Sequence, residues 1–198
     1  MADTLEFWFD FASTYSYPAA ERVEEVAARH GLVVEWRPFL LGPIFQKQLG
    51  ITTSPFNLNP VRGHYMWRDV ERLCAAQALP FKKPSVFPRN SVLPARVALT
   101  LPQGLLPLFV RSVFRANFVD DLDISDAQVL RPLLSALGLD AVSYLTRAAS
   151  AEEKPKLRAQ TERADALGLF GAPSFIRGGE LFFGGDRLEQ AAAWKPAV

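Results

Sequence analysis

Strand-like sequence stands near the two ends of this chain, and that placement limits the folds the chain can adopt. Residues 4–10 form a short aromatic run typical of a buried strand, and residues 15–30 carry apolar side chains at helical spacing. Gly31 is a typical residue at a helix C-terminus, and residues 32–37 follow it as a second predicted strand. The N-terminal segment is therefore predicted to be a strand–helix–strand unit with a parallel crossover.

The C-terminal segment has the opposite order of elements. Residues 173–177 and 180–183 are two short predicted strands, and the glycine pair at positions 178 and 179 is a strong hairpin signal. Residues 186–194 are predicted to form a final helix. The chain thus ends in a strand–strand–helix unit.

The stretch between these units is predicted to be mostly helical. Residues 41–60 are rich in Gly, Pro, Asn, Ser and Thr, which favours a long loop with room for one helical turn. Residues 61–78 are predicted as one helix and residues 90–167 as several. Breaks are expected near Gly104, Asp123 and Gly138, with helix starts at Ser125-Asp126 and Asp140.

These patterns predict an α/β fold of βαβ…ββα order that is interrupted by a large all-helical insertion. The α/β part comprises residues 1–40 and 168–198, and residues 41–167 form the loop and helical insertion.

The composition excludes several classes of function. The 198 residues carry 22 basic and 21 acidic side chains, so we expect no nucleic-acid binding through a strong positive field. Cys74 is the one cysteine and there are two histidines, so we expect neither an intrachain disulfide nor a metal site. The sequence shows no membrane span of roughly 20 apolar residues and no secretory signal, so we expect a cytoplasmic protein without membrane contacts.

The first candidate for chemistry is the junction between the first strand and the first helix. A helix N-terminus that follows a strand offers unpaired backbone N–H groups and the positive end of the helix dipole to an anion. Ser13 lies at this junction, where its hydroxyl can donate to a bound anion or thiolate. The alternative is that Ser13 only caps the helix.

Two further candidates lie near the C-terminal hairpin. The Ala172-Pro173 bond precedes it and is a candidate cis peptide, although an ordinary trans bond is the alternative. After the hairpin, Gly184 and Gly185 let the backbone approach a ligand, and Asp186 can hold an ammonium group or simply cap the last helix.

Taken together, these features resemble the 2-hydroxychromene-2-carboxylate isomerase family, a relative of the kappa-class glutathione transferases with a DsbA-like thioredoxin fold. The similarity covers nearly the whole chain. It is carried by residues 10–17, Asn57, residues 62–69 and 87–90, and residues 171–173 through 185–188. One departure is Thr14, since the family usually has proline after this serine, so the start of the helix lacks the φ angle that proline fixes.

The resemblance implies glutathione as the cofactor, because a chain with one cysteine cannot form the Cys-x-x-Cys pair of the redox members. Cys74 lies on an apolar helical stripe and is predicted to be a buried spectator. Ser13 would then stabilise the glutathione thiolate, as the catalytic residue. The implied glutathione-binding residues are Ser13, Asn57, Ala172, Pro173, Phe183, Gly184, Gly185 and Asp186.

The resemblance also implies the substrate, an aromatic carboxylate that is isomerised by reversible thiolate addition. Three cations are candidates for its carboxylate, and aromatic residues are candidates for a wall of its cavity. The implied substrate residues are Lys47, Asn57, Arg62, Phe87 and Arg89, with Phe45, Phe56 and Tyr65 as further aromatic candidates.

Two alternatives to the isomerase remain open: a kappa-like glutathione transferase that conjugates glutathione to electrophiles, and a non-catalytic thioredoxin-like binding module. Relatives of this kind imply a homodimer.

Overall fold

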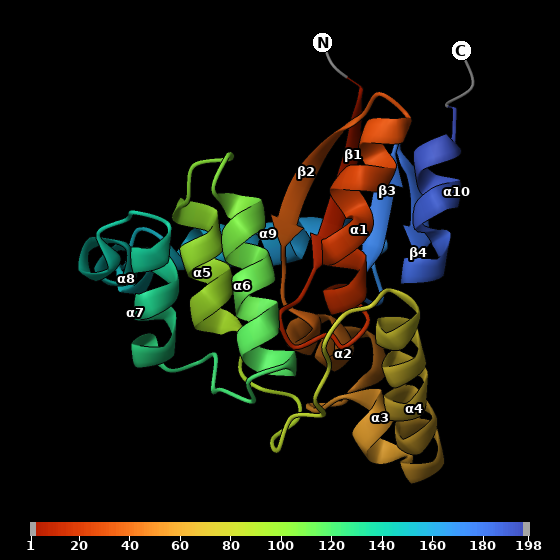
Figure 1. Ribbon diagram of the computed structural model, residues 1–198, viewed down its shortest axis with the longest axis horizontal. Helices are drawn as coiled ribbons and strands as arrows, with labels where there is room; N and C mark the ends of the chain where they lie inside the picture. The colour runs from red at the N-terminus through yellow and green to blue at the C-terminus, as the bar shows by residue number, and fades with distance from the viewer. Residues whose placement is uncertain (1–2, 196–198) are drawn as a thin grey trace.

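A four-stranded mixed sheet forms the centre of the fold in the computed structural model, which describes residues 3–195 (Figure 1). The strand order is β2-β1-β3-β4; β1 pairs with β2 in parallel and with β3 antiparallel, and β3 pairs with β4 antiparallel. The strands are β1 (Thr4–Phe9), β2 (Val33–Pro38), β3 (Ser174–Arg177) and β4 (Glu180–Phe183). The predicted βαβ…ββα order is confirmed, while residues 1–2 and 196–198 of the predicted α/β part lie outside the described residues.

The two faces of β1 bury different cores because its side chains alternate. Phe7 and Phe9 belong to the larger core, which they share with helix α1 (Ser16–Arg29). Trp8 points to the other face, where its ring packs against Phe39 with ring centroids 6.0 Å apart. The strand is therefore buried on both sides, as its aromatic sequence predicts.

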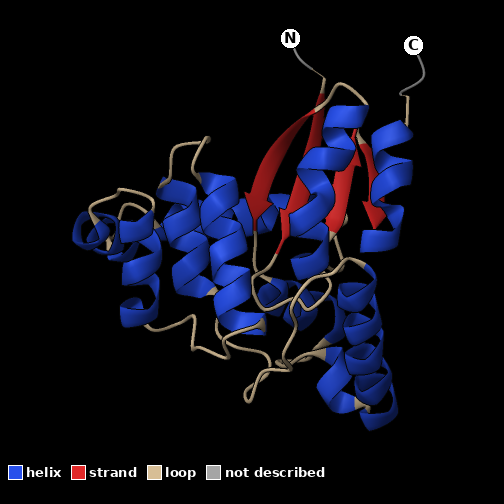
Figure 2. Ribbon diagram, viewed as in Figure 1, coloured by secondary structure: helices blue, strands red, loops and turns tan. Residues whose placement is uncertain are grey.

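Helices cover both faces of this sheet (Figure 2). In the view of Figure 1, α1 and α10 (Leu188–Ala193) lie in front of the sheet and α9 (Lys154–Ala166) lies behind it. A short 3-10 turn, η1 (Gly185–Arg187), leads into α10. Since α9 contacts β2 and α2 (Leu41–Leu49), the last helix of the predicted insertion completes the second layer of the sheet. The division into residues 1–40 with 168–198 and residues 41–167 stays a prediction.

The helical block begins and breaks largely where the sequence predicts. Its breaks fall near Gly104, Asp123 and Gly138, and the carboxylates of Asp126 and Asp140 cap the helices that follow them. One break was not predicted, at residues 150–153 before α9. The helices are α4 (Pro60–Ala76), α5 (Val92–Thr100), α6 (Leu106–Phe118), α7 (Ala127–Ala136) and α8 (Ala141–Ala149).

The predicted loop over residues 41–60 is wrong for residues 41–49, which form α2, while the four-residue helix that follows is the one helical turn that the prediction allows. In α2, Pro43 lies in the first turn, where a missing N–H group costs nothing, and Ile44 is buried against the second core. Helix α3 (Pro55–Leu58) begins after Ser54, whose hydroxyl accepts the Phe56 N–H at 3.3 Å. Local composition favours a loop here. Burial of Ile44 in α2 and the Ser54 cap of α3 stabilise helix instead.

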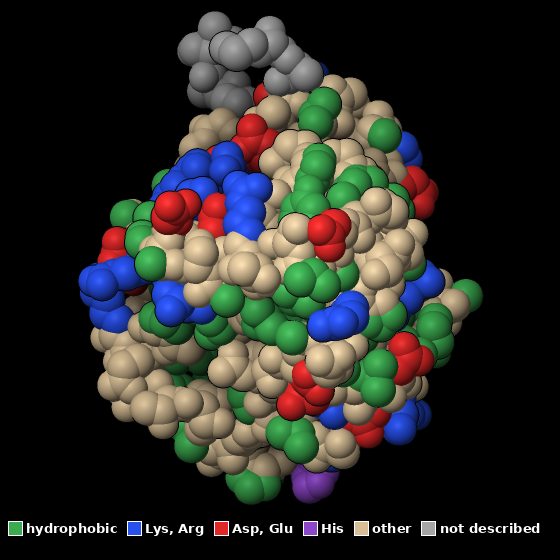
Figure 3. Space-filling model, turned by 90° about the vertical axis from the view of Figure 1, so that its left-hand side faces the viewer, with side chains coloured by type: hydrophobic (Ala, Val, Ile, Leu, Met, Phe, Trp, Pro, Cys, Tyr) green, Lys and Arg blue, Asp and Glu red, His purple; other side chains and the backbone are tan. Residues whose placement is uncertain are grey.

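Charges of both signs are mixed on the face of the molecule drawn in Figure 3, where Lys and Arg side chains lie beside Asp and Glu. Within residues 3–195, we find no helix with the length and apolar character needed to cross a membrane.

Candidate functional site

Ser13 lies in the turn between β1 and α1, at the end of the sheet from which both cavities described below open. Its side chain is almost buried, with 7% of the residue exposed. The hydroxyl donates to the Ala172 carbonyl oxygen at 2.8 Å and accepts the Ser16 N–H at 3.3 Å. It therefore satisfies one free N–H group of α1, as a cap does, and also bridges to the loop before β3.

The Ala172-Pro173 peptide bond is cis, the first of the two alternatives that the sequence leaves open. Ala172 is buried and faces Ser13, while the Pro173 carbonyl oxygen accepts the Gly184 N–H at 2.9 Å. Gly184 has φ of +101°, a backbone conformation that favours glycine. The loop before β3 and the turn after β4 are thus held together beside the start of α1.

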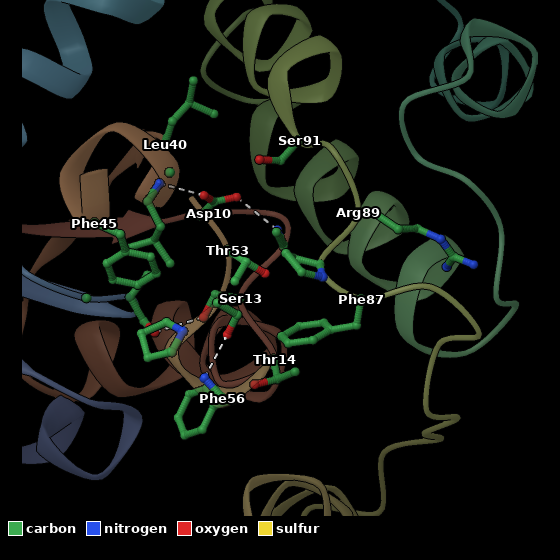
Figure 4. A pocket seen from close by; sticks show the side chains of 18 of the residues that line it. Asp10, Ser13, Thr14, Leu40, Phe45, Thr53, Phe56, Phe87, Arg89 and Ser91 are labelled. Carbon is green, nitrogen blue, oxygen red and sulfur yellow. Dashed lines mark hydrogen bonds between the residues drawn. The ribbon is translucent and has the colours of Figure 1, made fainter. Parts of the chain in front are cut away.

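A cavity of about 570 Å³ opens beside Ser13, and its walls are mostly apolar (Figure 4). In Figure 4 the rings of Phe45 and Phe87 lie on either side of Ser13. Phe56 also lines this cavity, whereas Tyr65 is not part of its lining and is 64% exposed. A volume of this size fits a small aromatic ligand.

A second cavity of about 480 Å³ lies on the other side of the Ala172-Pro173 peptide. The predicted residues Pro173, Phe183, Gly184, Gly185 and Asp186 all line it. The two cavities share three lining residues, so an extended ligand with its reactive group at Ser13 can occupy both. The shared residues are Tyr15, Ala172 and Phe183.

The second cavity presents several hydrogen-bond acceptors. They are the carboxylates of Asp69 and Asp186, two residues of its lining. The Tyr15 hydroxyl donates to the Asp69 carboxylate at 3.1 Å, and burial together with that carboxylate raises the pKa of Tyr15, which keeps the phenol protonated. This group of acceptors fits the ammonium end of a peptide-like ligand.

Of the three predicted cations, the structure brings one into the first cavity as a free group. Arg62, on α4, lines the cavity, is exposed, and forms no salt bridge within the described part of the chain. Lys47 does not line it, because its ammonium group pairs with the Asp165 carboxylate on α9.

Arg89 corrects the sequence interpretation in a different way. Arg89 belongs to the lining of the cavity, but in Figure 4 its guanidinium points away from Ser13. The guanidinium is buried and donates to the Asn117 side chain at 3.1 Å and to the Asp121 carbonyl at 2.9 Å. These contacts make Arg89 an anchor of the loop that carries Phe87, and the guanidinium is not presented to a ligand.

Asn57 lies beside the wall of the first cavity and outside the lining of both. Its side-chain amide donates to the Phe87 carbonyl oxygen at 3.0 Å and to the Thr53 hydroxyl at 3.2 Å. In this structure Asn57 therefore holds the aromatic wall, and direct contact with a ligand stays a prediction.

Cys74 cannot serve as the nucleophile of this site. It lies on α4 with 1% of the residue exposed, and burial raises the pKa of its thiol to about 11. Any sulfur at Ser13 must come from a ligand.

Two residues of the site, Asp10 and Tyr15, belong to the motif of residues 10–17 but are not among the predicted site residues. Asp10 is the one acidic side chain in the lining of the first cavity, among the described residues, and it is 3% exposed. Its place as the last residue of a predicted strand, next to the predicted turn that carries Ser13, is a local signal for a site residue. Tyr15 follows Ser13 in the motif, but its bond to Asp69 joins residues 54 positions apart, which no local pattern shows.

The comparisons with known proteins agree with this geometry. A family model for the DSBA-like thioredoxin domain matches residues 4–193. The chain is 29% identical to 2-hydroxychromene-2-carboxylate isomerase of Sphingobium xenophagum, over 96% of each chain. It is 27% identical to glutathione s-transferase kappa 2 of Caenorhabditis elegans, over 95% of this chain and 89% of that one. A solved 2-hydroxychromene-2-carboxylate isomerase shares the fold, with a TM-score of 0.85 at 22% identity, over 94% of this chain and 91% of that one.

Proposed function

Because this chain belongs to the DSBA-like thioredoxin domain family and carries a serine where a redox member needs a thiol, we propose that it is a glutathione-dependent isomerase. The proposed reaction interconverts 2-hydroxychromene-2-carboxylate and trans-o-hydroxybenzylidenepyruvate, a step in the breakdown of naphthalene-like aromatics. The observation that carries this proposal is Ser13, a nearly buried hydroxyl at the start of α1 that lines the first cavity, close to Ala172, where the second cavity adjoins it. The isomerase names of the relatives support the same activity.

The residues present fit glutathione. The Asp69 and Asp186 carboxylates, on residues that line the second cavity, offer acceptors to an ammonium group there. The cavities meet at Ala172, beside Ser13, so a tripeptide extended across them places its thiol at the start of α1. When bound, glutathione supplies a thiolate that adds reversibly to a conjugated double bond and so allows rotation about it.

The chain's own residues bind and orient the thiol and the substrate and shield them from water. With glutathione bound, the Ser13 hydroxyl, which here donates to the Ala172 carbonyl, would donate to the sulfur instead, next to the positive end of the α1 dipole. A lowering of the thiol pKa by one unit needs about 1.4 kcal/mol, which one charge-assisted hydrogen bond supplies. Arg62 pairs with the substrate carboxylate, and the rings of Phe45 and Phe87 enclose its aromatic part and exclude water.

The test follows turnover of the chromene with glutathione present and measures free glutathione at the end. Recovery of all glutathione supports an isomerase. Consumption supports the kappa-like transferase, which the similarity to a kappa transferase favours as the second candidate. Absence of glutathione binding by calorimetry would leave a non-catalytic binding module and overturn both.

Ser13→Ala should raise the pKa of the bound thiol by about one unit and lower turnover at neutral pH about tenfold. Ser16→Ala is the matched control, since that buried hydroxyl has no hydrogen-bond partner among the described residues. Wild-type turnover in Ser13→Ala would refute the assigned role. A homodimer and a cytoplasmic location stay predictions.

A further inference from the structure

Asp10 is a buried carboxyl group at the edge of the first cavity, directly after β1 (Figure 4). One carboxylate oxygen accepts the Ala12 N–H at 2.9 Å, and the other accepts the Leu41 N–H at 2.8 Å. Ala12 belongs to the turn that carries Ser13, and Leu41 is the first residue of α2. A single side chain thus joins the turn before α1 to the helix that bears Phe45.

No cation balances this carboxyl group. Within the described residues it forms no salt bridge. The other charged groups in the lining are Arg62 and Arg89, of which Arg89 is bonded to Asp121, and on α2 the Lys47 ammonium pairs with Asp165. From the side of α5, the uncharged Ser91 hydroxyl faces the carboxylate.

A buried carboxylate without a cation costs folding stability, so stability alone does not explain it. The two backbone donors explain why the residue is an acid. Each N–H meets its own carboxylate oxygen, whereas asparagine would turn an NH2 group toward one of these donors. Perturbed acids of this kind in cavities are characteristic of functional sites.

We propose that Asp10 is a positioning residue of this site: its ionised carboxylate fixes the Ser13 turn against the start of α2, so that the Ser13 hydroxyl and the Phe45 ring hold one geometry around the substrate. This role rests on the proposed isomerase function. Asp10 acts through Ala12 and Leu41 and does not itself react.

The value of kcat should therefore depend on the protonation state of Asp10. Burial raises its pKa above the ordinary value, while the Leu41 N–H, the Ser91 hydroxyl and the Ala12 N–H act in the opposite direction. A protonated carboxyl has one O–H in place of an acceptor and cannot accept from both N–H groups equally. The acid limb of the kcat profile should accordingly lie above the pH at which an ordinary aspartate titrates.

The first experiment uses the unliganded protein, so it does not depend on the proposed function. The amide NMR signals of Ala12 and Leu41 should titrate together with one pKa, and Asp10→Asn should abolish that titration. Amides that titrate with different pKa values, or not at all, would overturn the shared hydrogen-bonding role.

The second experiment measures kcat, and KM for glutathione, against pH. Asp10→Asn should lower kcat about tenfold or more, as small misplacements of reacting groups do, while KM for glutathione changes less than about twofold. Ser91→Ala, which keeps the carboxyl group, should move the acid limb to higher pH, because the Ser91 hydroxyl lowers the pKa of Asp10. This second variant keeps the proposal testable if Asp10→Asn folds poorly.

The matched control is Asp140→Asn. The Asp140 carboxylate accepts the Val142 N–H at 3.1 Å and the Ser143 N–H at 3.4 Å at the start of α8, outside the lining of either cavity. The Asp140→Asn variant should have a lower free energy of unfolding than the wild type and keep the wild-type kcat. If the wild-type protein does not turn over the chromene with glutathione present, the proposed isomerase function itself is refuted. Active wild type together with an unchanged Asp10→Asn profile refutes only the role of Asp10.

Discussion

Arg89 offers a clear test of whether the guanidinium is an anchor or a substrate contact. The change is Arg89→Met, which keeps most of the apolar stem and removes the charge. In the structure this guanidinium is buried and donates to the Asn117 side chain at 3.1 Å and the Asp121 carbonyl at 2.9 Å. Asn117 in turn donates to the Phe11 carbonyl at 2.9 Å, so the loss reaches the turn before Ser13.

The size of the effect follows from these contacts. Hydrogen bonds from a charged donor contribute about 1.5 to 3 kcal/mol each, and removal of one partner from a buried pair costs about 3 to 5 kcal/mol. We expect Arg89→Met to lower the free energy of unfolding by about 3 kcal/mol. For a chain of this length, that corresponds to a fall in Tm of roughly 6 to 12 °C.

Urea unfolding and calorimetry measure both quantities. Arg62→Met is the matched control, because Arg62 is exposed and forms no salt bridge among the described residues. Its stability should change by less than about 0.5 kcal/mol, while KM for the chromene carboxylate rises. The reasoning is refuted if Arg89→Met keeps the wild-type Tm and weakens substrate binding, since the guanidinium would then serve the substrate.

Two other predictions concern groups whose pKa is shifted. With a pKa of about 11, roughly one in 10,000 Cys74 thiols is ionised at pH 7, so a thiol reagent should modify the folded protein far more slowly than the urea-unfolded one. Equal rates would contradict its burial. The Ser85 N–H and then the Arg89 guanidinium hold the pKa of Asp121 well below its usual value, so this carboxylate contributes stability above pH of about 4 and loses it as the pH falls through its folded pKa. The stability gap between wild type and Asp121→Asn in urea should therefore narrow on acidification, and a constant gap would count against this ion pair.

The strands and the long helices follow from local pattern. The aromatic run of β1, the hairpin glycines, and the aspartate caps of α7 and α8 express preferences that act within a few residues. The exception is α2, whose sequence favours a loop. Its first N–H is satisfied by Asp10, which lies 31 positions earlier in the chain, so no local pattern could show it.

The same distinction applies to the site. The Ser13 motif, the Ala172-Pro173 bond and the turn at Gly184 were visible as separate features, and the fold brings them to two adjoining cavities. The sequence could not show which of the three basic residues is free to bind the substrate carboxylate. Lys47 is paired by Asp165, 118 positions away, and only the packing of α2 on α9 creates that pair.

The sequence by itself determined the order of strands and helices, the lack of a second cysteine, and the hydroxyl at the start of the first helix, because each is a property of one short segment. Only the tertiary structure decided which charges are free, which are bound, and which carboxyl group is buried at the cavity. Those outcomes depend on the partners that distant segments bring within hydrogen-bonding distance and on the water that their packing excludes.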